Sequence, residues 1–148
     1  MALSWLVEMG KVMVSINSNG RHISLSTDNR MSYVSDHWNH RVMKWNKDAK
    51  EGIVVAGSQG EGKALTQLNH PNGLFVDTLG ALYVADQWNH RVMRWTQEAK
   101  QGTVVGGGNC WGAGENQFNV PYGLSFDRHG NLYVADAHNN RVQRFSLQ

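Results

Sequence analysis

Residues Asp86–Trp95 read Asp-Gln-Trp-Asn-His-Arg-Val-Met-Arg-Trp, and this stretch decides the fold because it occurs three times. A first copy, Asp-His-Trp-Asn-His-Arg-Val-Met-Lys-Trp, starts at Asp36, and a third, Asp-Ala-His-Asn-Asn-Arg-Val-Gln-Arg-Phe, starts at Asp136. Successive copies begin 50 residues apart. A constant period of this length is typical of repeat proteins, in which each repeat is one supersecondary unit. We therefore expect three copies of one structural unit.

The second copy shows the unit most clearly, because short runs of strand-forming residues alternate with turn residues along it. Four strands are expected in it, at residues 74–76, 81–85, 91–95 and 103–105. Four short strands joined by turns are typical of one blade of a β-propeller. A solenoid of strand–helix units is the alternative, and it is disfavoured because no stretch of ten or more residues has helical periodicity.

The repeated pattern Pro-x-Gly-Leu, followed by Asp-x-x-Gly-x-Leu-Tyr-Val-Ala-Asp-x-x-Asn-x-Arg-Val, resembles the NHL repeat. In the second copy it consists of Pro71, Gly73, Leu74, Asp77, Gly80, Leu82, Tyr83, Val84, Ala85, Asp86, Asn89, Arg91 and Val92. In the third copy it consists of Pro121, Gly123, Leu124, Asp127, Gly130, Leu132, Tyr133, Val134, Ala135, Asp136, Asn139, Arg141 and Val142. The first copy lacks the proline and the turn glycine, and it is one residue shorter in the turn that precedes Asp36.

The resemblance implies an NHL-type β-propeller, a family that usually closes at six blades. We place blade 1 at about 23–56, blade 2 at about 71–106 and blade 3 at about 121–146, within a single unit spanning 1–148. The third blade has only three strands, and the alternating stretch 11–16 is left over.

A three-bladed arc would leave blade faces uncovered and a strand edge unpaired, and closure into a ring removes both. The sequence therefore predicts an all-β protein with three four-stranded blades per chain. Two chains would form a six-bladed C2 homodimer in which strand 11–16 of each copy completes the partner's third blade. The alternative left open is that the sequence is a piece of a longer chain.

Composition excludes several classes of function. The 14 basic residues nearly balance the 12 acidic ones, giving a net charge of +2, so charge alone does not indicate nucleic-acid binding. Cys110 is the only cysteine, so no disulfide can form within the chain. No uncharged run approaches the ~20 residues that a membrane span needs. We expect a cytoplasmic protein with no membrane partner and no cofactor.

The loops between the second and third strands of each blade, together with the blade linkers 57–70 and 107–120, are expected at one end of the molecule, called here the linker end. Eight residues at this end are candidates for ligand binding: His37, Trp38, His70, Asn72, Gln87, Trp88, Tyr122 and His138. Trp38 and Trp88 stand out because strand packing does not require a large ring in a turn. They could form a stacking platform for a base, a sugar or a peptide side chain. Packing against the neighbouring blade is the alternative.

The Asp and Arg that recur in every copy are expected to be structural, with Asp capping the turn and Arg spanning blades. The histidines that do not repeat, His37, His70 and His138, are candidates for a metal site, although no His-x-His or Cys-x-x-Cys spacing supports one. No phosphate loop or nucleophile–base pair is recognisable.

We therefore expect a non-enzymatic binding or scaffold module that presents the linker end to a protein or small ligand. A metal-dependent lyase or hydrolase and an RNA-binding domain are the alternatives that the family resemblance keeps open.

Overall fold

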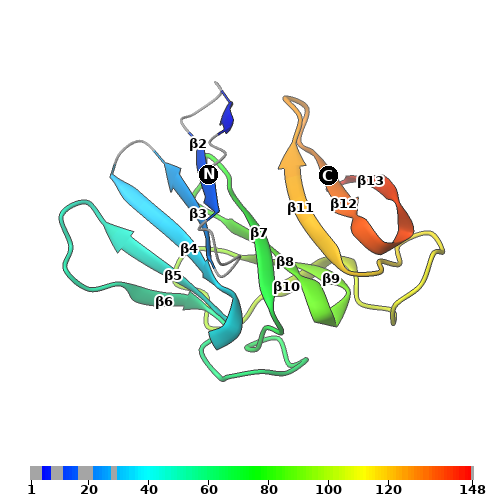
Figure 1. Cartoon of the computed structure of the whole chain (residues 1–148), viewed down its shortest axis with the longest axis horizontal. Helices are drawn as coiled ribbons and strands as arrows, with labels where there is room; N and C mark the ends of the chain where they lie inside the picture. Colours follow the sequence, from blue (N-terminus) through cyan, green and yellow to red (C-terminus); the bar gives the residue numbers. More distant parts are fainter. Residues whose placement is uncertain (1–4, 8–11, 17–21, 28–29, 148) are drawn as a thin grey trace.

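The computed structural model describes residues 5–7, 12–16, 22–27 and 30–147, with side chains from residue 30 onward. In this part of the chain every regular element is a β-strand or a single turn of 3-10 helix, and the strands form three antiparallel sheets (Figure 1). The prediction of an all-β chain is confirmed. Among these residues, none lies in a helix with the length and apolar character needed to cross a bilayer.

The first sheet has six strands and contains blade 1. Its strands, in spatial and sequence order, are β1 (Trp5–Val7), β2 (Val12–Ile16), β3 (His22–Thr27), β4 (Met31–Asp36), β5 (Arg41–Asn46) and β6 (Ile53–Ala56). Strands β3 to β6 make up the blade. Strand β2 pairs with β3, with Ser15 opposite Ser24. In the single chain, β2 therefore extends the edge of blade 1. This is the strand expected to complete the partner's third blade, and its exchange between copies stays a prediction.

Blades 2 and 3 form the other two sheets. Blade 2 consists of β7 (Pro71–Val76), β8 (Leu82–Asp86), β9 (Arg91–Trp95) and β10 (Thr103–Gly107). Blade 3 consists of β11 (Pro121–Phe126), β12 (Asn131–Asp136) and β13 (Arg141–Ser146). Among the described residues, no strand pairs with the second edge of β13. Three sheets of this kind fit part of a β-propeller.

The three blades meet along their first strands, because β7 lies between β3 and β11 (Figure 1). Apolar side chains fill the two blade boundaries. Val42 and Leu68 belong to the cluster between blades 1 and 2, and Val92 and Phe118 belong to the cluster between blades 2 and 3. Leu68 and Phe118 come from the blade linkers, so each linker helps to close the boundary that it crosses.

Blade 1 differs from the others in its first strand and not in the turn that follows it. Tyr33 pairs with Leu25, eight positions earlier, and Tyr83 pairs with Phe75 at the same separation. Strand β7 instead has a β-bulge after Pro71, and β11 has the equivalent bulge, whereas β3 pairs with β4 without a shift. The expectation of a shortened turn before Asp36 is wrong, because the missing residue is the extra residue of the bulge.

A recurrent polar network fixes each turn at the linker end, and its geometry corrects the role expected for the repeated Asp. These turns are the 3-10 helices η1 (His37–Asn39), η2 (Gln87–Asn89) and η3 (Ala137–Asn139), and the preceding Asp makes no capping bond to their backbone. In blade 2, Asp86 instead accepts hydrogen bonds from Arg91 Nε at 2.6 Å and Asn89 Nδ2 at 2.9 Å. The left-handed residue of the turn is the one after the Asn, as at His90, while the Asn side chain belongs to this network.

The buried carboxylates in this network differ between blades. Burial raises the pKa of Asp86, although Arg91 and the backbone N–H of Asn69 oppose this. Burial acts in the same direction on Asp136, but hydrogen bonds from Asn119 N–H and three side chains outweigh it, and the pKa is lowered. In both blades the carboxylate also accepts a 2.7 Å bond from the linker backbone, so the network ties each linker to its blade.

Candidate functional site

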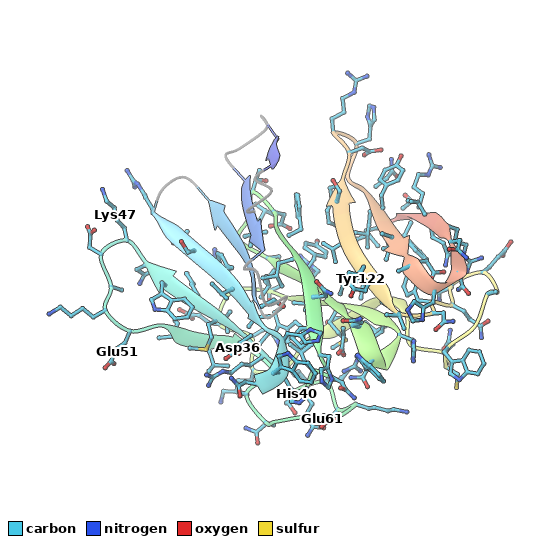
Figure 2. The ribbon with its side chains drawn as sticks, in the orientation of Figure 1. Asp36, His40, Lys47, Glu51, Glu61 and Tyr122 are labelled. Carbon is cyan, nitrogen blue, oxygen red and sulfur yellow. The ribbon has the colours of Figure 1, made fainter. Side chains whose placement is uncertain are left out.

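The linkers and the 3-10 turns lie at the same end of the molecule, as the sequence predicts. The N–H of Trp88 donates to the carbonyl of Asn69, and the N–H of His138 donates to the carbonyl of Asn119. Figure 2 shows Asp36, His40 and Glu61 near this end, with Lys47 and Glu51 on the loop at the far end of blade 1. The linker end therefore gathers loop residues from adjacent blades.

Four aromatic rings pack around the ring of His70 at the boundary between blades 1 and 2, and we call the five residues together the His70 cluster. Its members are His37, Trp38, His40, His70 and Trp88. The His70 ring centroid lies 4.4 Å from that of His40, 4.9 Å from His37, 5.1 Å from Trp38 and 5.5 Å from Trp88. Trp38 is nevertheless 61% exposed and Trp88 is 58% exposed. Two indoles thus flank the histidines while keeping most of their surface in solvent.

Hydrogen bonds determine which ring nitrogen of each histidine in this cluster carries the proton and which has a lone pair. His37 Nδ1–H donates to the carbonyl of Pro71 at 3.1 Å, so its neutral ring has a lone pair on Nε2. His70 Nδ1 bonds to Asn69 Oδ1 at 2.6 Å, which leaves its Nε2 free in the same way. His40 Nδ1 accepts the backbone N–H of His70 at 3.2 Å, so Nε2 carries its proton, 3.7 Å from Glu61 Oε2.

Burial and mutual repulsion keep the central histidines neutral. Burial lowers the pKa of His37, and proximity to His40 adds to this, while the bond to Pro71 opposes it. Burial also lowers the pKa of His70, as do His40 and His37, against the opposing charge of Glu61. At neutral pH the cluster therefore presents uncharged imidazoles between two indoles.

The other ligand-binding candidates do not join this cluster. Asn72 and Gln87 are buried, and Asn72 Nδ2 donates to Gln87 Oε1 at 3.3 Å. Tyr122 and His138 are exposed and come from blade 3, where His138 has the position of Trp38 and Trp88 in the earlier copies. The structure thus brings together four of the eight candidates, namely His37, Trp38, His70 and Trp88.

The three histidines considered as metal ligands are divided between two boundaries. His37 and His70 are in contact, whereas His138 lies near His90, where it helps to lower the pKa of that histidine. Within the described residues, no three His, Cys, Asp or Glu side chains are grouped so that they could hold a metal ion. The three-histidine site is therefore not formed.

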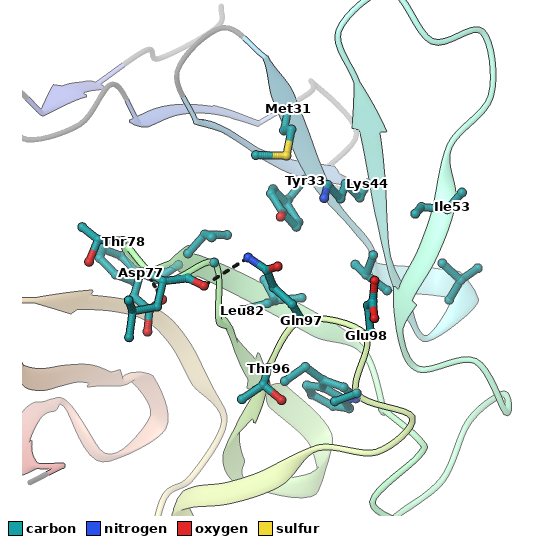
Figure 3. Close-up of a pocket in the computed structure, with 18 residues that line it drawn as sticks. Met31, Tyr33, Lys44, Ile53, Asp77, Thr78, Leu82, Thr96, Gln97 and Glu98 are labelled. Atoms are coloured by element: carbon teal, nitrogen blue, oxygen red, sulfur yellow. Dashed lines mark hydrogen bonds between the residues drawn. The ribbon is translucent and has the colours of Figure 1, made fainter.

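A cleft of about 830 Å³ opens between blades 1 and 2 at the opposite end of β8, beside the turn Asp77–Gly80 (Figure 3). We call this end of the blades, which lies opposite the linker end, the turn end. Met31, Tyr33 and Lys44 lie on the blade 1 side of the cleft, while Leu82 and Gln97 belong to blade 2. No sequence pattern predicts a cleft here, since all eight residues expected to bind a ligand belong to the linker end.

The two boundaries differ in what packs at the turn end. Between blades 2 and 3, the ring of Phe126 lies 4.7 Å from the rings of both Phe75 and Tyr83. Between blades 1 and 2, Val76 holds the position of Phe126 and lines the cleft, while Tyr33 is as buried as its counterpart Tyr83.

Comparison with known proteins identifies the repeat. The family model for the NHL repeat matches residues 68–94 and 118–145. No curated protein matches the sequence significantly.

Several solved structures share the fold. An auxiliary nutrient binding protein from Bacteroides thetaiotaomicron has a TM-score of 0.69 at 14% identity, covering 97% of this chain and 47% of that one. An auxiliary nutrient binding protein from Bacteroides ovatus has a TM-score of 0.67 at 16% identity, covering 98% and 48%. A structural genomics protein of unknown function from Bacteroides thetaiotaomicron has a TM-score of 0.68 at 18% identity, covering 97% and 46%.

This chain thus spans about half the length of each of these structures. The likeness concerns the fold, since the identities are low. Together with the two matched repeats, it confirms the resemblance on which the expected fold rests. Residues 68–94 and 118–145 of this chain match the NHL repeat, and the chain has the fold of part of a β-propeller.

Proposed function

We propose that this chain is a non-enzymatic binding module whose linker end binds a ligand through the His70 cluster. The observation that carries this proposal is the exposure of two indoles, Trp38 and Trp88, on either side of His70. A large apolar ring left in solvent costs free energy that a ligand stacked on it recovers.

The chemistry of the cluster suits a small ligand with a ring or a flat apolar face. The indoles offer stacking surfaces, His37 and His70 each offer an Nε2 acceptor, and His40 offers an Nε2–H donor. A sugar, a nucleobase or an aromatic peptide side chain combines such a face with donors and acceptors at its edge. The description of two structures of the same fold as nutrient binding proteins supports a small nutrient molecule first, and a protein segment second.

A ligand screen tests this proposal. Monosaccharides, nucleosides and aromatic amino acids would be screened by thermal shift, and the strongest ligand measured by titration calorimetry. Loss of one stacking ring costs about 1–3 kcal/mol, so Trp38→Ala or Trp88→Ala should weaken binding by about 5- to 150-fold. Trp111→Ala is the matched control, since Trp111 is 68% exposed and lies outside the cluster.

Equal affinity in all three tryptophan variants would contradict the assignment of the site. A single-stranded RNA probe in the same screen separates the RNA-binding alternative, because RNA affinity falls steeply with salt whereas stacking of an uncharged ligand does not.

We also propose that the chain's first partner is a second copy of itself, which closes a six-bladed ring. Val42 and Val92 are fully buried under linker residues, whereas their counterpart Val142 is 66% exposed. Val142 lies on β13, whose second edge is unpaired within the described residues. A blade from another copy would bury this valine and pair this edge. Further blades of a longer chain would do the same, and the mass of the species that this chain forms in solution separates the two.

A further inference from the structure

The open nitrogen atoms of the two central histidines are hydrogen-bond acceptors. The Nε2 atoms of His37 and His70 carry lone pairs, because the proton of each neutral ring is on Nδ1. Within the described part of the chain, Asn89 Oδ1 and Arg94 Nε are the only buried side-chain nitrogen or oxygen atoms without a hydrogen-bond partner. The two Nε2 atoms also have no partner among these residues, so both are in contact with solvent.

Glu61 brings a negative charge to the edge of the His70 cluster. Its Oε2 lies 3.7 Å from the protonated Nε2 of His40, and its side chain is 57% exposed, so the carboxylate stays open to solvent (Figure 2). The charge also acts on His70, where it opposes the effect of burial on the pKa. A carboxylate accepts hydrogen bonds and donates none. The cluster therefore combines a negative charge with two imidazole acceptors.

Three basic side chains of the same blades and linker are directed elsewhere. Arg41 Nε pairs with Asp36 at 2.9 Å, and Arg91 donates to three backbone carbonyls of the linker. Lys63 helps to lower the pKa of His90, at the boundary between blades 2 and 3. The imidazoles of the cluster are themselves uncharged at neutral pH, because their pKa values are lowered. None of these groups therefore opposes a cation at the cluster.

The boundary between blades 2 and 3 shows that the fold does not require the two acceptors or the carboxylate. The residues 50 positions later are Gln87 for His37, Val120 for His70 and Trp111 for Glu61. The contact that holds the linker is nevertheless kept, since His90 Nδ1 accepts the N–H of Val120 at 3.2 Å, as His40 accepts that of His70. The structural histidine is thus repeated, whereas these three groups are not.

We infer, on the basis of the function proposed for the linker end, that the ligand of the His70 cluster carries a protonated amine beside its ring. The ammonium group donates N–H bonds to an open Nε2 of His37 or His70. Its charge is attracted by the carboxylate of Glu61 and by the faces of the two exposed indoles. A neutral ligand with the same ring lacks this attraction, and an anionic one is repelled by Glu61.

Three probes that share a phenyl ring and differ in charge test this inference. They are phenethylamine, which is a cation, phenethyl alcohol, which is neutral, and hydrocinnamate, which is an anion. Each is titrated by calorimetry into the whole chain at about pH 7.5, where an unperturbed imidazole is already mostly neutral. We expect phenethylamine to bind about tenfold more tightly than phenethyl alcohol, and hydrocinnamate to bind most weakly.

Variants of the acceptors measure their share of this preference. Glu61→Gln removes the charge at similar size, so it should reduce the preference for the amine over the alcohol by about two- to fivefold. Glu51→Gln is the matched control, because Glu51 is an exposed carboxylate on the loop at the far end of blade 1, and the preference should stay as it is (Figure 2). The double variant His37→Gln with His70→Val gives this boundary the residues of the next one. It should reduce the preference by about tenfold.

The outcomes separate this inference from the function on which it rests. Equal affinity of the original chain for the three probes, with binding weakened by Trp38→Ala, would overturn the inference and leave the stacking site in place. A preference for the amine that persists in Glu61→Gln and in the double histidine variant would also overturn it. Binding of no probe, or binding that neither Trp38→Ala nor Trp88→Ala weakens, would contradict the proposed function itself.

Discussion

Asp86 and Arg91 form the most buried ion pair in the described part of the chain, with Oδ2 and Nε 2.6 Å apart and the Arg91 side chain only 7% exposed. The same guanidinium donates to the backbone carbonyls of Lys63, Ala64 and Gln67. Arg91 therefore holds the linker between blades 1 and 2 against blade 2. Because that linker continues to His70, this pair also positions the candidate site.

Removing Arg91 should destabilise the chain strongly. Arg91→Ala leaves the Asp86 carboxylate buried without its cation, and breaking a buried ion pair in this way costs about 3–5 kcal/mol. Arg141→Ala is the matched control, since Arg141 makes the equivalent bonds in blade 3 but is 32% exposed, so its loss should cost less. Urea denaturation of both variants measures the difference, and equal losses would show that burial does not determine the contribution of the pair.

Stability should fall on mild acidification because of the histidines in the His70 cluster. The pKa values of His37 and His70 are lowered in the folded chain, so below about pH 6.5 the unfolded chain binds more protons than the folded one. The free energy of unfolding is therefore highest above pH 6.5 and decreases as the pH falls toward the lowered values. Urea denaturation at a series of pH values from 7.5 to 5 measures this slope.

The repeats themselves supply the control for the pH effect. Gln87 holds the place of His37 in the next copy, and Val120 holds that of His70 with the same left-handed backbone, φ 58° against 53°. The double variant His37→Gln with His70→Val should flatten the slope between pH 7 and 5, while His90, whose pKa is also lowered by burial, keeps its contribution. An unchanged slope would show that these two rings do not determine the pH dependence.

The positions of the strands were predictable from the sequence. Which side chains are exposed at the linker end, and which line the cleft, was predictable only in part. Strands such as β8 and β12 alternate strand-forming residues between recognisable turns, so local chemistry sets their positions. The place of Trp38 and Trp88 in turns left two outcomes open, a stacking platform or packing against the neighbouring blade, and residue type alone does not decide between them. Likewise, burial of Asn72 and Gln87 depends on a contact between two strands, which residue type alone does not reveal.

The cleft could not be predicted because it depends on how two blades pack against each other. Val76 is an ordinary strand residue by itself, and its residue type does not show that it lines an open space between blades. The sequence likewise could not place β2, because its alternating pattern suits an edge of either blade.

Cysteine pairs can determine which strand β2 pairs with in solution. With Cys110→Ser to remove the native thiol, Ser15→Cys and Ser24→Cys would be joined within one chain if β2 stays on blade 1, since these residues are opposite each other. Val12→Cys with Gln143→Cys should instead give a dimer linked between chains if β2 completes the partner's third blade. In the repeat, Val12 matches Val104, which pairs with Met93, the counterpart of Gln143. We predict the dimer on non-reducing gels, and an exclusively intrachain bond would contradict the strand exchange.

The exposed face of blade 3 should be needed for assembly. Val142→Glu places a charge where the second copy is expected to bury a valine, so it should weaken the dimer by at least tenfold. Val104→Glu is the control, because Val104 is an exposed valine on the outer strand β10, away from the proposed contact. Size-exclusion chromatography over a range of concentrations compares the two, and equal behaviour would argue against contact through blade 3.

The central proposal is that the three blades of one chain are completed by a second copy, and sedimentation equilibrium of the unmodified chain tests it most directly. We predict a single species with twice the mass of the chain, which persists on dilution to low micromolar concentration. A stable, soluble species with the mass of one chain would contradict closure of the ring by self-association.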